Sequence, residues 1–199
     1  MKTTFMFLII AALVFAGCGS SRQVSRVAAD QQTDLSGKWN DTDSRLVAEQ
    51  MVSSLTGRPW VGDFVSQNNK KPTVIVGTIR NLSSEHIQTD IFVKDIEREL
   101  VNSGKVTFVA NKQEREEVRE ERLDQQVQAT EETAKKLAAE TGADFMLKGS
   151  IKDQVDRVDG TESKFYQVDM ELINLETNEK VWIDTKKIKK IVERSGSSW

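Results

Sequence analysis

The sequence is poor in the residues that build catalytic and metal centres. Its 199 residues include one cysteine, Cys18, and one histidine, His86. A single cysteine excludes an internal disulfide framework and an all-cysteine metal site, and a single histidine excludes a multi-histidine metal site. Basic and acidic residues nearly balance, with a formal net charge of -3, so nothing draws the chain strongly to nucleic acid or anionic lipid. We therefore expect no nucleic-acid partner.

Motifs of known chemistry are also missing. The chain has no Walker pattern, no Rossmann glycine fingerprint and no G-x-S-x-G elbow. Asp153, Asp156 and Asp159 are spaced by three, which is not an EF-hand spacing, and a strand would point alternate residues to opposite faces. His86 lies in a polar segment and is interpreted as a solvated loop residue. These absences predict a protein that is not an enzyme, with no metal, no cofactor and no small-molecule substrate.

The only long apolar run is at the N-terminus. Lys2 precedes an almost unbroken apolar stretch over residues 5–15, which is too short to span a bilayer and has the length of a signal-peptide core. Phe15-Ala16-Gly17-Cys18 resembles a bacterial lipobox, where cleavage precedes an acylated cysteine. We predict a signal peptide over 1–17 and a lipid anchor on Cys18. Gly19, in place of Asp, favours the outer membrane by resemblance to enterobacterial sorting.

The segment after Cys18 is expected to be a flexible tether that ends at Asp34. Residues 19–34 are rich in Ser, Gln, Arg, Asp and Thr and carry few large apolar side chains. Sixteen residues at roughly 3.3 Å each would reach about 50 Å when fully extended. The folded domain is predicted to occupy residues 35–192, and residues 193–199 are expected to form a frayed tail.

Hydrophobic periodicity predicts alternating helices and buried strands in the first two thirds of this domain. Helical spacing begins after the possible N-caps Thr42, Asp43 and Ser44, and Ser103-Gly104 ends a later helix. The expected helices are 44–55, 60–65, 89–103, 114–124 and 130–141, and the expected strands are 73–79, 106–109 and 143–151. Residues 114–124 are dense in both charge signs, which indicates a solvated helix, with an acidic docking surface as the alternative.

The last third changes to a period of two. Residues 166–172 alternate apolar and polar side chains, a turn follows at 176–179, and residues 181–191 return. Val155 and Val158 suggest a separate edge strand before the Asp159-Gly160 turn. Together the patterns predict a single α/β domain, with buried βα units followed by an antiparallel meander in a mixed sheet that carries helices.

A partner surface is expected beyond the carboxyl end of the first buried strand, because binding surfaces of open α/β sheets gather there. The loop combines hydrogen-bonding groups with Leu82 and Ile87, which the pattern leaves exposed. The alternative interpretation is that its polar side chains only satisfy the backbone of the turn, and both interpretations stay open. The candidate partner-binding residues are Asn81, Ser84, Glu85 and His86.

Several phrases in order resemble a known family. They are GKWNDTDS (37–44), VGTIRN (76–81), EHIQT (85–89), VNSGKV (101–106), TGADFMLKG (141–149) and LETNEKVW (175–182). Behind a lipobox, this ordered set resembles the LpoB family of penicillin-binding protein activators over roughly residues 36–190.

The resemblance implies an α/β domain similar to the N-terminal domain of TolB. It also implies an outer-membrane lipoprotein that faces the periplasm, binds a class A penicillin-binding protein and stimulates peptidoglycan synthesis without catalysis of its own. Enterobacterial members carry a long proline-rich tether, whereas residues 19–34 contain no proline. The alternative is a structural or assembly subunit of an envelope or secretion complex, since CsgG has a related core. The charged arm at Lys186, Lys187, Lys189 and Lys190 argues against a pore.

Overall fold

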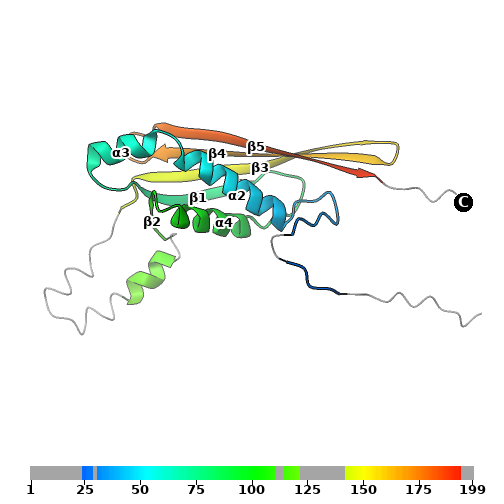
Figure 1. Ribbon diagram of the computed structural model, residues 1–199, viewed down its shortest axis with the longest axis horizontal. Helices are drawn as coiled ribbons and strands as arrows, with labels where there is room; N and C mark the ends of the chain where they lie inside the picture. Colours follow the sequence, from blue (N-terminus) through cyan, green and yellow to red (C-terminus); the bar gives the residue numbers. More distant parts are fainter. Residues whose placement is uncertain (1–23, 29–30, 111–113, 122–141, 194–199) are drawn as a thin grey trace, which may run out of the picture. The chain divides into compact units, whose positions relative to one another are not determined.

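The computed structural model describes residues 24–28, 31–110, 114–121 and 142–193 (Figure 1). They fall into two units, the first ending at Gln31 and the second beginning at Gln32. The second unit contains every helix and strand given below. The expected signal peptide, Cys18 and the expected helix over 130–141 lie outside the described residues.

Three helices have well-defined ends. They are α2 (Asp41–Thr56), α3 (Trp60–Asn68) and α4 (Thr89–Ser103). A capping box between Asn40 and Asp43 starts α2, and Gly104, with φ of 63°, ends α4 in the left-handed conformation that glycine adopts freely. Residues 114–121 are also helical, which confirms the described part of the expected charged helix. No helix in these described ranges is long and apolar enough to cross a membrane.

The strands form one mixed sheet in the order β2-β1-β3-β4-β5. Their bounds are β1 (Thr73–Asn81), β2 (Thr107–Phe108), β3 (Phe145–Val158), β4 (Thr161–Asn174) and β5 (Lys180–Glu193). β1 pairs in parallel with both β2 and β3, and β3, β4 and β5 follow as an antiparallel meander. The predicted α/β architecture is therefore confirmed.

One predicted strand boundary is wrong. Val155 and Val158 do not begin a new edge strand; they continue β3, which pairs without interruption with β4 as far as Val158 opposite Thr161. Asp159 and Gly160 both have positive φ, 45° and 82°, which suits a two-residue hairpin turn. The apolar run ends near Ile151 because β3 leaves the densely packed part of the domain, and its outer half is mostly exposed.

The sheet has two different faces. Helices α2 and α4 pack on one of them, which we call the helix face, and α3 covers its end through edge-on contacts of Trp60 and Phe64 with Phe145. The side chains of β4 at Tyr166, Val168, Met170 and Leu172 point there and are almost fully buried. The opposite side, which we call the open face, carries the alternate residues of the same strands.

Candidate partner-binding site

Asn81 shapes the loop that follows β1. Its side-chain amide donates a hydrogen bond to the carbonyl oxygen of Glu85 at 2.7 Å, and its Oδ1 accepts from the backbone N–H of Ser83 at 3.0 Å. A side chain that closes its own turn in this way pre-orders the loop before any partner arrives.

The loop is also fastened to β3. The Leu82 N–H donates to the carbonyl oxygen of Ile151 at 2.8 Å, and the Ser84 N–H donates to Oδ1 of Asp153 at 2.8 Å. The hydroxyl of Ser84 donates to the other oxygen of the same carboxylate. Asp153 therefore holds a loop, and the described residues contain no cluster of His, Cys, Asp or Glu that could hold a metal ion.

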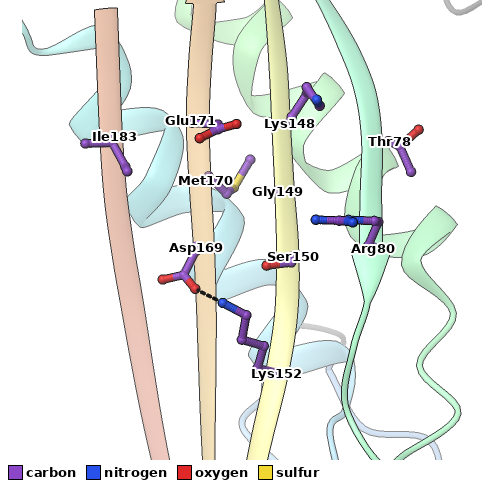
Figure 2. A pocket seen from close by; sticks show the side chains of 10 residues that line it. All are labelled: Thr78, Arg80, Lys148, Gly149, Ser150, Lys152, Asp169, Met170, Glu171 and Ile183. Atoms are coloured by element: carbon purple, nitrogen blue, oxygen red, sulfur yellow. Dashed lines mark hydrogen bonds and ion pairs between the residues drawn. The ribbon is translucent and has the colours of Figure 1, made fainter. Parts of the chain in front are cut away.

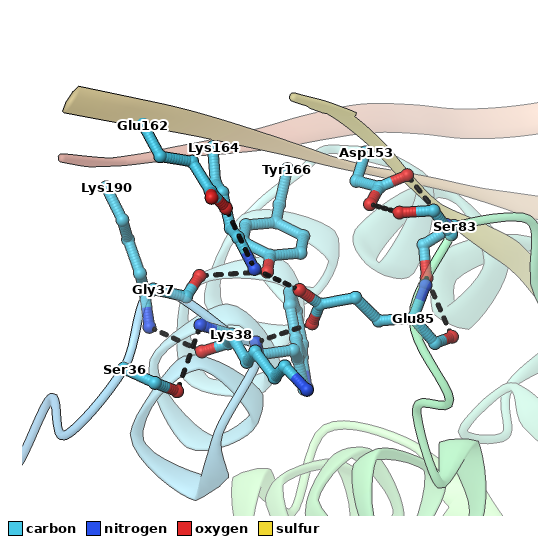
Figure 3. A network of polar contacts seen from close by, with 12 residues as sticks. Ser36, Gly37, Lys38, Ser83, Glu85, Asp153, Glu162, Lys164, Tyr166 and Lys190 are labelled. Atoms are coloured by element: carbon cyan, nitrogen blue, oxygen red, sulfur yellow. Dashed lines mark hydrogen bonds and ion pairs between the residues drawn. The ribbon is translucent and has the colours of Figure 1, made fainter. Parts of the chain in front are cut away.

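Glu85 makes a nearly buried ion pair (Figure 3). Its Oε1 lies 2.7 Å from Nζ of Lys164 on β4, and the two side chains are only 12% and 9% exposed. Its Oε2 accepts the backbone N–H of Trp39 at 3.0 Å. Burial alone would raise the pKa of Glu85, but Lys164, the Trp39 N–H and the nearby Tyr166 hydroxyl favour the carboxylate and bring the pKa below its usual value. Glu85 is thus a charged link between the loop, the sheet and the chain before α2.

Tyr166 on β4 also holds the chain before α2 in place. Its hydroxyl donates to the carbonyl oxygen of Gly37 at 3.0 Å, and its ring meets Trp39 edge-on with centroids 5.7 Å apart. Burial and the nearby carboxylate of Glu85 raise the pKa of Tyr166, so the hydroxyl stays a donor. Gly37 packs so closely on β5 that a Cβ atom there would collide with the side chain of Val192.

Lys190 on β5 binds the chain before α2 at a second place. Its Nζ lies 2.7 Å from Oδ1 of Asp34 and 2.6 Å from Oδ2 of Asp43, and it donates to the carbonyl oxygen of Lys38. Hydrogen bonds from Lys190 and Asn40 lower the pKa of Asp34, whereas burial raises the pKa of Asp43 in spite of the same lysine. We call residues 33–39 the N-terminal strap, because these contacts bind them across the helix face.

The four predicted loop residues differ in burial and in hydrogen bonding. Asn81 and Glu85 turn their polar groups inward, Ser84 is exposed but bound to Asp153, and His86 is exposed. Leu82 is 51% exposed as expected, but Ile87 is 8% exposed and belongs to the core, so its expected exposure is wrong. A partner-binding role for the four residues stays a prediction.

Sequence reasoning missed Lys164 and Lys190, although a signal was present. Lys164 has the same phase as the buried residues Tyr166 and Val168, and Lys190 has the same phase as Trp182. In a strand, a charged residue in phase with an apolar face points inward and needs a partner.

The open face carries a shallow hollow of about 520 Å³ (Figure 2). Lys152 and Asp169 pair across its lower end at 2.8 Å, while Lys148 on β3 and Arg80 on β1 extend into the space between these two strands. The remaining lining residues are Thr78, Gly149, Ser150, Met170, Glu171 and Ile183. Arg80 is two residues before Leu82, so this hollow and the exposed part of the loop are neighbours along the chain.

Solved structures of LpoB proteins are similar to this chain. The C-terminal domain of LpoB from Salmonella enterica is 18% identical, with 68% of this chain and 94% of that one covered, at a TM-score of 0.34. The NMR structure of Escherichia coli LpoB is 14% identical, with 88% and 87% covered, at a TM-score of 0.41. No curated protein sequence matches the chain.

The family assignment comes from a sequence model. The model described as "Peptidoglycan-synthase activator LpoB" matches residues 43–188, from the first turn of α2 into β5. This range includes the loop after β1, the ion pair of Glu85 and Lys164, and the whole open-face hollow. Because the match spans most of the chain, the protein belongs to the LpoB family.

Proposed function

We propose that this protein is a noncatalytic regulator that binds a class A penicillin-binding protein and stimulates its synthesis of peptidoglycan. The observation that carries this proposal is the LpoB family match over residues 43–188. That family is one of noncatalytic activators, so the expected action is a contact that changes the activity of the synthase.

The arrangement of charged groups supports binding over catalysis. A catalytic acid or base needs access to a substrate and a pKa suited to proton transfer. Here Glu85 and Asp43 have shifted pKa values, but each of them is held inside the domain against a lysine. Their role is to fix the loop and the N-terminal strap in place.

The proposed location is the periplasmic side of the outer membrane, with lipid on Cys18. The lipobox-like sequence that ends at Cys18 supports this anchor. Several acyl chains on one residue bind a bilayer far more tightly than one, since each buried methylene contributes about 0.8 kcal/mol. Replacement Cys18→Ala should move the protein from the membrane fraction to the soluble one or leave it unprocessed. Normal processing with full retention in outer membranes would refute the anchor.

Within this proposal, the loop after β1 takes part in partner contact through its outward side chains. Leu82, Ser84 and His86 are exposed, while Asn81 and Glu85 hold the loop in shape. A rigid loop with one exposed apolar side chain among polar groups suits the rim of a protein interface.

The test is reconstitution. The full-length lipoprotein, purified in detergent, is added to a class A synthase from the same organism, and glycan polymerisation and peptide crosslinking are measured with lipid-linked precursor. We expect direct binding and faster synthesis, and no synthesis by the lipoprotein alone. Absence of binding to every class A synthase of the organism, together with co-purification of another envelope complex, would instead support an assembly subunit.

A further inference from the structure

The open face of strands β3, β4 and β5 has the features of a protein-binding surface. We propose that this face, together with Arg80 at the end of β1, binds the partner, and that the partner presents an acidic protein surface to it. This inference rests on the proposed function and deepens it, because it names the surface used and the charge of the partner.

The first observation is that the described helices leave this face uncovered. Helices α2 and α4 contact the other side of the sheet, and the open-face side chains of β5 at Ile183, Thr185, Lys187 and Lys189 are all exposed. The register of the three strands sets these residues beside their equivalents on β4 and β3, so they form continuous rows across the sheet.

The second observation is unbalanced positive charge. The acids in the middle of the face are already paired, Asp169 with Lys152 at 2.8 Å and Glu171 with Lys180. Further cations have no acidic partner among the described residues, and the other acids of the face, Asp156 and Glu193, lie at its outer end. The unpaired cations are Arg80, Lys148, Lys187 and Lys189. The face is therefore positive although the chain carries a net charge of -3.

The third observation is exposed apolar surface between these charges. Ile183 is 67% exposed beside Glu171, and Phe165 is half-buried between Gln154 and Lys189 in the adjacent strands. Arginine and aromatic side chains in a polar setting are the usual composition of a protein interface. An anionic glycan would bind through the cations alone and would leave Ile183 and Phe165 exposed. Burial of these two side chains requires a partner that has apolar surface of its own.

The fourth observation is size. Each of the three strands has 14 residues, which at about 3.3 Å per residue gives a length of roughly 45 Å, and neighbouring strands lie about 4.8 Å apart. With the adjoining part of β1, the face offers an area close to the roughly 800 Å² per partner of a standard interface.

The test is charge reversal at two exposed positions. The variant Lys187→Glu/Lys189→Glu is compared with the control Lys38→Glu/Arg58→Glu, which makes the same charge change at exposed positions off this face. We expect the first variant to weaken binding of the class A synthase at least tenfold at low salt, and the control to change it less than twofold. Melting temperatures of both should stay near that of the wild type.

Other results would overturn the proposal in distinguishable ways. Equal binding by wild type and the Lys187/Lys189 variant would exclude the open face while leaving the proposed function intact. No binding of any synthase by the wild type would overturn the proposed function and this surface with it. If the variant loses sedimentation with purified peptidoglycan and keeps synthase binding, the occupant is the cell wall and the proposed partner is wrong.

A labelling experiment checks that the face is free before the partner arrives. In a Cys18→Ala background, Ile183→Cys should react with a maleimide as fast as the control Leu175→Cys, which is also exposed, and synthase should protect only the first. Slow labelling of Ile183→Cys in the free protein would show that the face is already covered without a partner, and would refute the proposal.

Discussion

Lysines at alternate positions of the same strands behave in opposite ways on the two faces of this sheet. Lys164 and Lys190 point to the helix face, where their side chains are 9% and 10% exposed and bind Glu85, Asp34 and Asp43. Lys187 and Lys189 point to the open face, are exposed, and have no acidic partner among the described residues. For these four lysines, the phase within the strand decides whether the charge is buried in an ion pair or exposed to solvent.

The two faces also contribute to two different free energies, that of folding and that of partner binding. Removing one partner of a buried ion pair strongly destabilises the folded protein, because the other charge is left unpaired away from water. An exposed lysine keeps its hydration, so its removal changes folding little and any effect must come from binding. Predictions about stability therefore belong to the helix face, and those about affinity to the open face.

The largest expected effect follows from Lys164→Ala. This change leaves the carboxylate of Glu85 buried without its cation and should lower the free energy of unfolding by about 3 kcal/mol. Urea denaturation followed by far-ultraviolet circular dichroism measures it. The double variant Lys164→Met/Glu85→Gln removes both charges and keeps an acceptor for the Trp39 N–H, so it should be more stable than Lys164→Ala. If Lys164→Ala is as stable as wild type, the buried pair contributes nothing.

Acid should weaken the ion pairs of the helix face. The pKa values of Asp34 and Glu85 lie below their usual 3.8 and 4.5, so their stabilisation is present above those values and is lost as the pH falls below them. Asp43, whose pKa is raised, acts in the opposite sense and offsets part of the loss. Unfolding measured from pH 6 to pH 3 should become easier toward low pH, with a slope of at most about 1.4 kcal/mol per pH unit for each proton bound. The Glu85→Gln variant should show a shallower slope; an unchanged slope would contradict the assignment.

A smaller effect is expected from Tyr166→Phe. The ring stays in the core while the hydrogen bond to the Gly37 carbonyl is lost, which should cost about 1 kcal/mol. Hydrogen exchange should show faster opening of the N-terminal strap in this variant. Unchanged exchange over residues 33–39 would mean that the contacts of Lys190 and Glu85 secure the strap without this hydrogen bond.

The smallest effect on stability is expected from Lys189→Ala on the open face. Its side chain is exposed and makes no ion pair within the described ranges, so the free energy of unfolding should change by less than about 0.5 kcal/mol. Differential scanning calorimetry of this variant beside Lys164→Ala gives the comparison directly. A loss near that of Lys164→Ala would mean that the two faces do not differ as described.

Most helices and strands could be predicted from the sequence because each is specified by a few neighbouring residues. The buried run at Thr73–Ile79, the glycine stop after α4 and the alternation from Tyr166 to Leu172 each identify an element within a few residues. The outer half of β3 was misassigned because its residues pair mainly with β4 and lose the apolar pattern away from the core.

The candidate site was harder to predict because its contacts join distant parts of the chain. Glu85 and Lys164 are 79 positions apart, and Lys190 and Asp43 are 147 apart. A loop sequence shows that Glu85 is polar, but only the fold shows that its charge is directed inward. His86, which has no such partner in the part of the chain that the structure describes, is exposed as its polar surroundings indicated.

The position of β5 at the edge of the sheet affects the tendency of this protein to self-associate. Among the described residues, no strand pairs with the outer edge of this 14-residue strand, and such an edge is a template on which an identical strand could add, which leads to aggregation. Repulsion between the exposed side chains of Lys187 and Lys189 on two such edges opposes that addition. These two charges therefore oppose self-association at this edge, and apolar replacements of Lys187 and Lys189 should lower solubility even where they leave the fold intact.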